Sequence, residues 1–292
     1  METTHLPSRS SAASGGLFAA LRRHSLIGYF GLAYGFTWTY VVLLLIRPNL
    51  PFTPAIIGPT AAALIMTAVT GGRAGIGQLL HRLVRWRLGI SWYLFVLVGI
   101  PLVYLLGAIV VAGGRLPDVP GSLLLRLAQS YPIGFVFTFF TGGPLFEEPG
   151  WRGFALPRLQ GRFGPLVGSL ILGALWVLWH VPMYLIPGFA AENGGLSFSG
   201  LGVFLLTALA FTVIMTWVFN HTRASLLLAI LLHTSINIFQ PVVNLLYPSQ
   251  ATTEVNGLIG FGVLALILVV MTRGRLGYHD AGAFAAEATV VR

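Results

Sequence analysis

Hydrophobic residues occur along this chain in long runs that are separated by short segments carrying most of the charged residues. A run of about 20 apolar residues is long enough to cross the hydrocarbon core of a bilayer as an α-helix. The pattern predicts eight such helices, with the second short and the fourth interrupted by charges: residues 26–46, 54–69, 92–112, 131–156, 165–186, 201–220, 225–246 and 255–271. We therefore expect an all-α fold, a polytopic integral membrane helical bundle with about eight transmembrane helices.

The predicted helices fill one transmembrane domain, residues 26–273, which leaves residues 1–25 and 274–292 as tails. The stretch 121–130 carries Arg126 among leucines and resembles a helix that lies at the membrane surface. Two glycine spacings, Gly31 with Gly35 and Gly164 with Gly168, would permit close helix crossing, although a chain with 36 glycines also produces such spacings by chance.

Composition supports the membrane assignment. The chain is 56% hydrophobic and only 9% charged, whereas soluble domains keep about a quarter of their residues charged. All 17 basic residues are arginines, and they are scattered between apolar runs rather than gathered in one basic patch. This distribution argues against a nucleic-acid partner. The absence of cysteine excludes disulfides, thiolate metal sites and a cysteine nucleophile.

The arginines also predict the orientation in the membrane, because loops on the cytoplasmic side of a bilayer carry an excess of basic residues. One set of loops holds most of them: Arg9, Arg22, Arg23, Arg73, Arg82, Arg85, Arg87, Arg152, Arg158, Arg162, Arg223, Arg273 and Arg275. The alternate loops hold few charges: Arg47, Arg115, Asp118, Glu192 and Glu254. Both termini are therefore predicted to be cytoplasmic.

Three charged residues, two histidines and one asparagine stand out within the predicted spans, where an ionised side chain costs about 2.5–3.5 kcal/mol at mid-bilayer. They are Glu147, Glu148, Arg152, His180, His233 and Asn237. Counting about 1.5 Å per helical residue from the nearest arginine-rich loops places Glu147, His180 and His233 roughly 15–22 Å deep. Three helices could thus bring a carboxylate and two imidazoles to one level in the membrane.

The spacing of these residues pairs them on helix faces. Glu148 and Arg152 are four residues apart with the acid first, which is the favourable order for an ion pair on one face of a continuous helix. Pro149 removes one backbone donor from that helix. His233 and Asn237 are also four residues apart and share a face.

Two carboxylates, two imidazoles and an amide suit the attack of water on a peptide carbonyl. One glutamate would act as general base, because burial makes a carboxylate a better proton acceptor, and His and Asn donors would stabilise the oxyanion. Alternatively, His180, His233 and Glu148 could hold one catalytic zinc ion, with the other glutamate as base. The sequence leaves the metal-free and zinc-dependent mechanisms equally open.

Two other classes of function use similar residues. A proton-coupled transporter also carries Glu and His on broken helices, but the sequence has no convincing internal repeat. A non-catalytic membrane protein that confers bacteriocin immunity is the third alternative.

Three short motifs resemble those of the CAAX-protease and bacteriocin-processing (CPBP) family of intramembrane endopeptidases. EEPGWRG at residues 147–153, Trp176 with His180, and HTSIN at residues 233–237 match the family's ordered patterns EExxxR, FxxxH and HxxxN/B. The resemblance covers about residues 135–239, and Trp176 departs from it because the pattern has Phe there.

The resemblance implies an intramembrane protease that is metalloprotease-like or glutamate-dependent, with a catalytic core at about residues 131–246. It implies that Glu147 is the general base and His180 assists it, that His233 and Asn237 line the oxyanion side, and that Glu148 with Arg152 shapes the site. The implied partners are the lipid bilayer and a membrane-associated protein or peptide, without a defined substrate or a known need for prenylation. The arginine-only, glycine-rich sequence looks like that of a prokaryotic plasma-membrane member of the family.

Overall fold

The computed structural model describes residues 16, 19–248 and 255–278, and these form helices joined by loops, with no β-strand. Most of the two predicted tails, together with Arg9 and Glu254, lies outside the described residues. Seven described segments are long and apolar enough to cross a bilayer: Ser25–Ile46, Ile90–Val111, Gly121–Thr141, Pro165–Leu185, Phe198–His221, Leu226–Leu246 and Val255–Thr272. The expected all-α membrane bundle is confirmed, with seven rather than eight apolar spans by these criteria.

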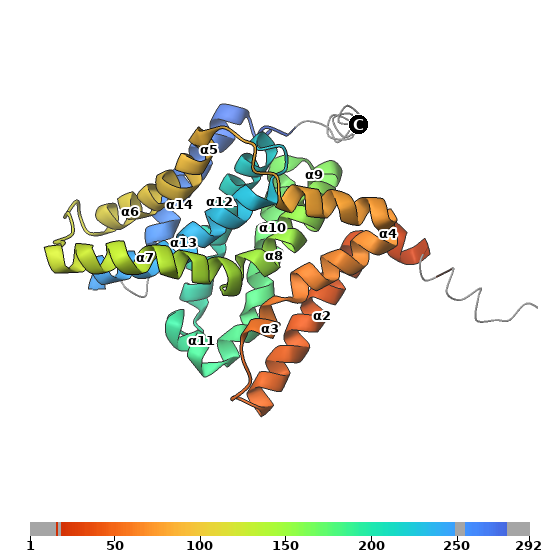
Figure 1. Cartoon of the computed structure of the whole chain (residues 1–292), viewed down its shortest axis with the longest axis horizontal. Coiled ribbons are helices and arrows are strands. Elements are labelled where there is room, and N and C mark those ends of the chain that lie inside the picture. The colour runs from red at the N-terminus through yellow and green to blue at the C-terminus, as the bar shows by residue number, and fades with distance from the viewer. Residues whose placement is uncertain (1–15, 17–18, 249–254, 279–292) are drawn as a thin grey trace, which may run out of the picture.

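These segments correspond to labelled helices in Figure 1. They comprise α2 (Ser25–Ile46), α5 (Ile90–Leu94) continuing through a π-helical turn into α6 (Ile100–Val111), α7 (Gly121–Thr141), α10 (Pro165–His180), α12 (Phe198–His221), α13 (Leu226–Leu246) and α14 (Val255–Thr272). The remaining helices are α3 (Thr53–Ile56), α4 (Gly58–Leu83), α8 (Pro144–Gly150), α9 (Leu156–Phe163) and α11 (Pro187–Glu192).

The predicted second span, residues 54–69, is too short. Helix α4 continues to Leu83 through a kink at Gly72, where φ is +58° and the backbone leaves the helical conformation. A residue without Cβ tolerates this positive φ, so the apolar first half of α4 is joined to a second half that carries Arg73 and Arg82.

The boundaries of the predicted fourth span and of the predicted surface helix are also wrong. Residues 121–130 do not form a separate helix, because α7 runs unbroken from Gly121 to Thr141. The chain then breaks at Gly142 and Gly143, and Gly143 has a φ of +103° that favours glycine. The charged residues of the predicted span 131–156 therefore lie on a new helix, α8, and on the π-helical turn that follows it.

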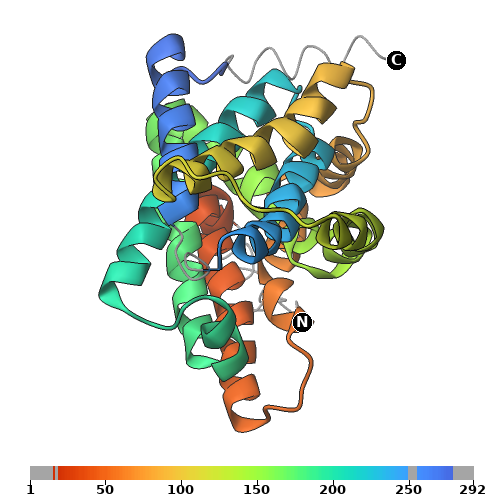
Figure 2. The ribbon, with the colours of Figure 1, turned by 90° about the vertical axis from the view of Figure 1, so that its left-hand side faces the viewer.

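Helix α8 lies near the middle of the molecule (Figure 1). It packs against α4 and α13, while α10 packs against α12, α12 against α14, and α14 against α6. Figure 2, turned by 90°, shows α2 and α10 running side by side. A hydrogen bond from the Trp38 indole to the Trp179 carbonyl, at 3.2 Å, joins these two helices.

Of the glycines singled out in the sequence, Gly168 lies in close helix contact, because an added Cβ would be 2.9 Å from Gln160 N on α9, whereas closer contacts occur elsewhere. A Cβ added to Gly31 or Gly35 would meet no atom within 4 Å, whereas one on Gly107 would lie 2.1 Å from the Asn256 carbonyl oxygen. A Cβ on Gly260 would similarly lie 2.3 Å from the Val103 carbonyl oxygen. These two glycines allow α6 and α14 to cross with their backbones in contact.

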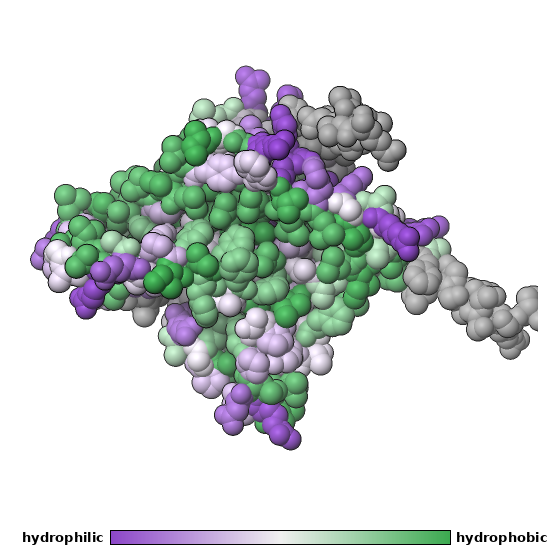
Figure 3. Space-filling model, in the orientation of Figure 1, coloured by the Kyte–Doolittle hydropathy of each residue, from purple (hydrophilic) through white to green (hydrophobic). Residues whose placement is uncertain are grey.

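The surface matches a bundle that lies in lipid. Figure 3 shows a broad hydrophobic area on the visible face, with hydrophilic residues gathered at its edges. Helix α7 contributes no buried residue, and its Ile133 and Phe137 side chains are 73% and 67% exposed. Large exposed apolar side chains are unfavourable in water, so they identify the surface that faces the acyl chains.

Candidate active site

Helix α8 and the turn after it carry three of the six predicted site residues. Pro144 begins α8 directly after the Gly143 break, and Glu147 and Glu148 follow within the first turns. Residues Trp151–Ala155 then form a π-helical turn. Wide turns of this type often occur at functional sites, and here the turn continues the helix past Pro149, so that Arg152 lies on the same side as Glu148.

Glu148 is the centre of a buried ion cluster. Its Oε1 accepts a hydrogen bond from Arg152 Nη1 at 2.9 Å and contacts His233 Nδ1 at 2.8 Å. Glu148 and Arg152 are 0% exposed and His233 is 4% exposed. Arg152 also donates to the Thr212 hydroxyl and lies over the Trp176 ring at 5.2 Å. The charge of this carboxylate is therefore balanced by a guanidinium and by an imidazole that can carry a second positive charge.

Glu147 is buried to the same degree but has different partners. Its Oε2 accepts hydrogen bonds from the indole N–H of Trp176 at 2.8 Å and of Trp151 at 3.4 Å. Its Oε1 lies over the backbone of Gly143, where an added Cβ would come within 2.6 Å. No cationic side chain pairs with Glu147 among the residues that the structure describes. Both of its side-chain hydrogen-bond donors are therefore uncharged indole groups.

His180 lies at the end of α10 with one ring nitrogen engaged. Its Nδ1 is 2.8 Å from the Trp176 carbonyl oxygen. Because a carbonyl can only accept, Nδ1 carries the hydrogen and Nε2 of the neutral ring keeps its lone pair. The ring contacts Trp176 and Trp179 edge-on, with centroids 5.5 and 4.6 Å apart. Glu147 and His233 are both close enough to interact with His180 electrostatically.

Trp176 connects the two halves of this arrangement. Its ring is perpendicular to that of His233 at 5.2 Å, it meets His180 on another side, and its N–H reaches Glu147. The sequence placed this tryptophan in a motif with His180 but gave it no role in the reaction. Its hydrogen bond to Glu147 depends on how α10 is rotated against α8. In the sequence, only its position four residues before His180 pointed to the site.

The structure brings together Glu147, Glu148, Arg152, His180 and His233. Asn237 lies one turn beyond His233 on α13 and is half-buried, and its amide makes no side-chain hydrogen bond within the described part of the chain. The amide therefore retains both donors for a ligand.

The three side chains of the zinc alternative are not arranged as ligands. Among the described residues, no group of three His, Cys, Asp or Glu side chains is close enough to hold a metal ion. In this arrangement, His180, His233 and Glu148 do not fit a tetrahedral zinc site.

Comparison with known proteins agrees with the three motifs. Residues 129–239 match the family model described as type II CAAX prenyl endopeptidase Rce1-like, and this region contains all six site residues. The chain is also 28% identical over 258 residues to CAAX prenyl protease 2 of Methanococcus maripaludis. That alignment covers 81% of this chain and 83% of the archaeal protein.

Proposed function

Because this chain is a CPBP-family intramembrane endopeptidase, we propose that Glu147 activates the water that hydrolyses the peptide bond of its membrane-associated substrate. The observation that supports this role is the contrast between two adjacent carboxylates. Glu148 is held by Arg152 and His233, whereas Glu147 accepts only from uncharged indole groups. A carboxylate that is not paired with a cation is the better proton acceptor of the two.

In the proposed reaction, Glu147 takes a proton from water while the water oxygen attacks the carbonyl carbon. The tetrahedral oxyanion then collapses, the C–N bond breaks, and the leaving amine takes the proton that Glu147 had received. The products are a carboxylic acid and an amine, which become a carboxylate and an ammonium group when the acid proton is transferred to the amine. His180 orients the water through Nε2, since its Nδ1 is engaged by the Trp176 carbonyl.

The oxyanion requires hydrogen-bond donors that are already in place. His233 directs Nδ1 towards Glu148, so Nε2 is the ring atom that is left to donate to the oxyanion when the ring carries both hydrogens. The Asn237 amide, one helical turn away on α13, is the second donor. Glu148 and Arg152 act as positioning residues, because they orient the His233 ring rather than touch the substrate.

The test of the base is cleavage of a membrane-tethered peptide reporter by the full-length protein in lipid vesicles. We expect Glu147→Gln to lower kcat by about 10²–10⁴-fold, the usual contribution of a general base. Glu192→Gln is the matched control, because it removes the same charge from an exposed position on α11. Equal kcat for Glu147→Gln and wild type, at equal thermal stability, would remove Glu147 from this role.

The same assay tests metal dependence. The proposed reaction uses no metal, so we expect cleavage to persist after chelation in a sample whose metal content has been measured. Activity that disappears on chelation and returns with Zn²⁺ would replace this mechanism with the zinc-dependent one.

The substrate class is also part of the proposal. The matching family model and the archaeal relative are both named for CAAX prenyl substrates, so we propose that the substrate carries a C-terminal CAAX sequence and a prenyl group. Two reporters that differ only in the prenyl group separate this point from the mechanism. Equal cleavage of both would contradict the prenyl requirement and leave the endopeptidase assignment intact.

A further inference from the structure

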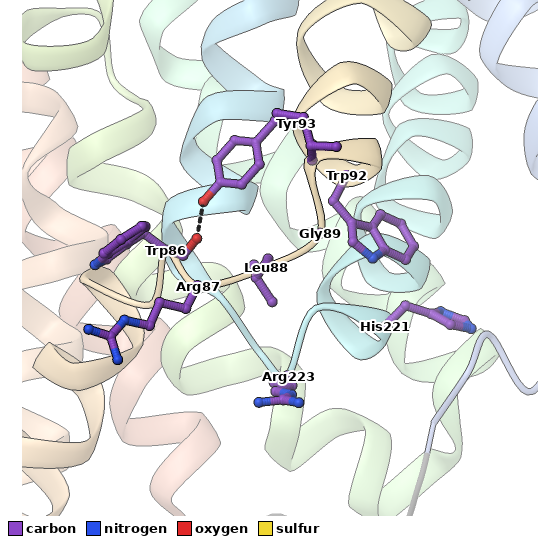
Figure 4. A pocket seen from close by; sticks show the side chains of 9 residues that line it. Trp86, Arg87, Leu88, Gly89, Trp92, Tyr93, His221 and Arg223 are labelled. Atoms are coloured by element: carbon purple, nitrogen blue, oxygen red, sulfur yellow. Dashed lines mark hydrogen bonds between the residues drawn. The ribbon is translucent and has the colours of Figure 1, made fainter.

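A second polar feature lies away from the buried glutamates, where the loop between α4 and α5 meets the loop between α12 and α13. It is a cavity of about 770 Å³. Figure 4 shows its walls, which include Trp86, Arg87, Trp92, Tyr93, His221 and Arg223. No acidic residue lines it. The proposed hydrolytic reaction makes no use of this cavity.

The two loops that form the cavity are fixed to each other by hydrogen bonds. Arg85 Nη1 donates to the Arg223 carbonyl, and the Ser225 hydroxyl donates to the Arg85 carbonyl at 2.8 Å. The Tyr93 hydroxyl donates to the Trp86 carbonyl at 2.5 Å and closes the upper wall in Figure 4. The cavity is therefore a preformed structure in which segments about 140 residues apart are linked.

The backbone of the second loop is strained. Arg223 and Ala224 have φ values of +53° and +57°, in the left-handed region that non-glycine residues seldom occupy. Such conformations persist only where the surrounding structure holds them, and they cluster at functional sites. Here the strain fixes the position from which the Arg223 side chain extends to the cavity.

The charge of the cavity is positive and not balanced. Arg87 and Arg223 reach it from different loops, and Arg87 lies over the Trp86 ring at 5.5 Å. Both ion pairs found among the described residues involve Glu148, which belongs to the other site. Arginine binds phosphate through paired hydrogen bonds, so two arginines that line one cavity without an acidic residue favour a phosphate-bearing ligand.

The surroundings favour an amphiphilic ligand over a soluble anion. Trp86, in the loop after α4, and Ile90, the first residue of α5, are 61% and 72% exposed beside the cavity. Tryptophan and tyrosine concentrate at the level of lipid headgroups, and the exposed side of α5 continues from this level as an apolar surface. A phosphate bound by Arg87 and Arg223 would place attached acyl chains beside that surface.

From these observations we infer that the cavity binds the phosphate headgroup of an anionic phospholipid from the leaflet at this end of the helices. The basic loops around it are those that the arginine distribution assigns to the cytoplasm, where anionic lipids are abundant. The inference does not depend on the hydrolytic mechanism, and its test measures binding rather than cleavage.

The test is a titration of delipidated full-length protein in detergent with dioleoyl phosphatidylglycerol, followed by native mass spectrometry. Parallel titrations use dioleoyl phosphatidylcholine and inorganic phosphate. We expect Arg87→Gln with Arg223→Gln to weaken phosphatidylglycerol binding by at least about tenfold, because a hydrogen bond to a charged group contributes roughly a factor of ten to a binding constant. The matched control is Arg73→Gln with Arg275→Gln, which removes two exposed arginines that line no cavity described here.

The outcomes separate a specific site from general attraction. Retained binding in the control pair and in Glu147→Gln, with loss in the cavity pair, supports the site. Equal weakening in both arginine pairs would overturn it in favour of diffuse attraction to the basic face. Binding of inorganic phosphate as tight as that of the lipid would overturn the lipid assignment. Should the double variant be unstable, the single change Arg87→Gln at an exposed side chain provides the same comparison.

Discussion

Two glutamates that are adjacent in the chain have opposite electrostatic surroundings in this protein. Successive residues on a helix point about 100° apart, so Glu148 faces Arg152 and His233 while Glu147 faces the indoles of Trp151 and Trp176. One acid belongs to a buried ion cluster, and the other is left as a carboxylate without a cation. The proposed roles, general base for Glu147 and positioning residue for Glu148, follow from this difference of one position along the helix.

The ion cluster leads to a stability prediction. Arg152→Met removes a guanidinium that is 0% exposed and leaves the equally buried Glu148 with one cationic partner fewer. Breaking a buried pair in this way costs about 3–5 kcal/mol, whereas replacing both members by uncharged residues is often nearly neutral. We expect a lower free energy of unfolding for Arg152→Met, measured in detergent by chemical denaturation.

The control is Glu148→Gln combined with Arg152→Met. We expect this double variant to regain most of the lost stability while cleavage stays impaired, because His233 is no longer oriented. A double variant as unstable as the single one would show that packing, rather than an uncompensated charge, accounts for the loss.

At the scale of the helices, the break between α7 and α8 determines where Glu147 and Glu148 lie. Apolar runs located most helices correctly, because hydropathy alone distinguishes a span from a loop. The break itself was missed, and the reason is visible elsewhere in the chain. Gly71 and Gly72 form the same dipeptide as Gly142 and Gly143, yet α4 continues after a kink, so tertiary packing decides whether two glycines bend a helix or end it.

Gly143→Ala tests the break directly. The alanine would have to adopt a φ of +103°, which residues with a Cβ rarely do, and its Cβ would lie 2.6 Å from Glu147 Oε1. Because a displacement of about 1 Å in a reacting group can lower a rate by about 10², we expect a loss of that order in kcat in the vesicle assay. Gly35→Ala is the control, since an added Cβ there meets nothing within 4 Å, and a similar loss in this control would contradict the argument.

At the scale of the whole molecule, the arginine distribution predicts one orientation. The chain has no cysteine, so single cysteines can be introduced without a background. We expect Asp118→Cys and Glu192→Cys to react with an impermeant maleimide added outside intact cells, and Arg162→Cys and Arg275→Cys to react only after permeabilisation. All four positions are exposed. The reverse labelling pattern would contradict cytoplasmic termini.

The sequence identified the residues of the site because charged residues are rare within apolar runs. Glu147, Arg152 and His180 stand out because burying them in a membrane is unfavourable without a function. The spacing of four residues predicted the ion pair of Glu148 with Arg152, which the structure confirms. Contacts between residues on separate helices were not predictable, because they depend on the rotation and approach of those helices. His233 lies 85 residues from the carboxylate that it contacts, and nothing in the spacing indicated Glu148 over Glu147. The cavity beside Arg223 was missed for the same reason, since its walls come from distant loops.

Helix α7 is loosely packed, and this bears on how a substrate reaches the site. It buries none of its side chains and packs mainly on α13, the helix that carries His233 and Asn237, and on α8. Less packing would be lost by shifting α7 than by shifting any well-buried helix, and the Gly142–Gly143 break gives it a hinge. If the substrate is the membrane-associated peptide proposed above, it would therefore enter the bundle laterally from the bilayer, beside α7.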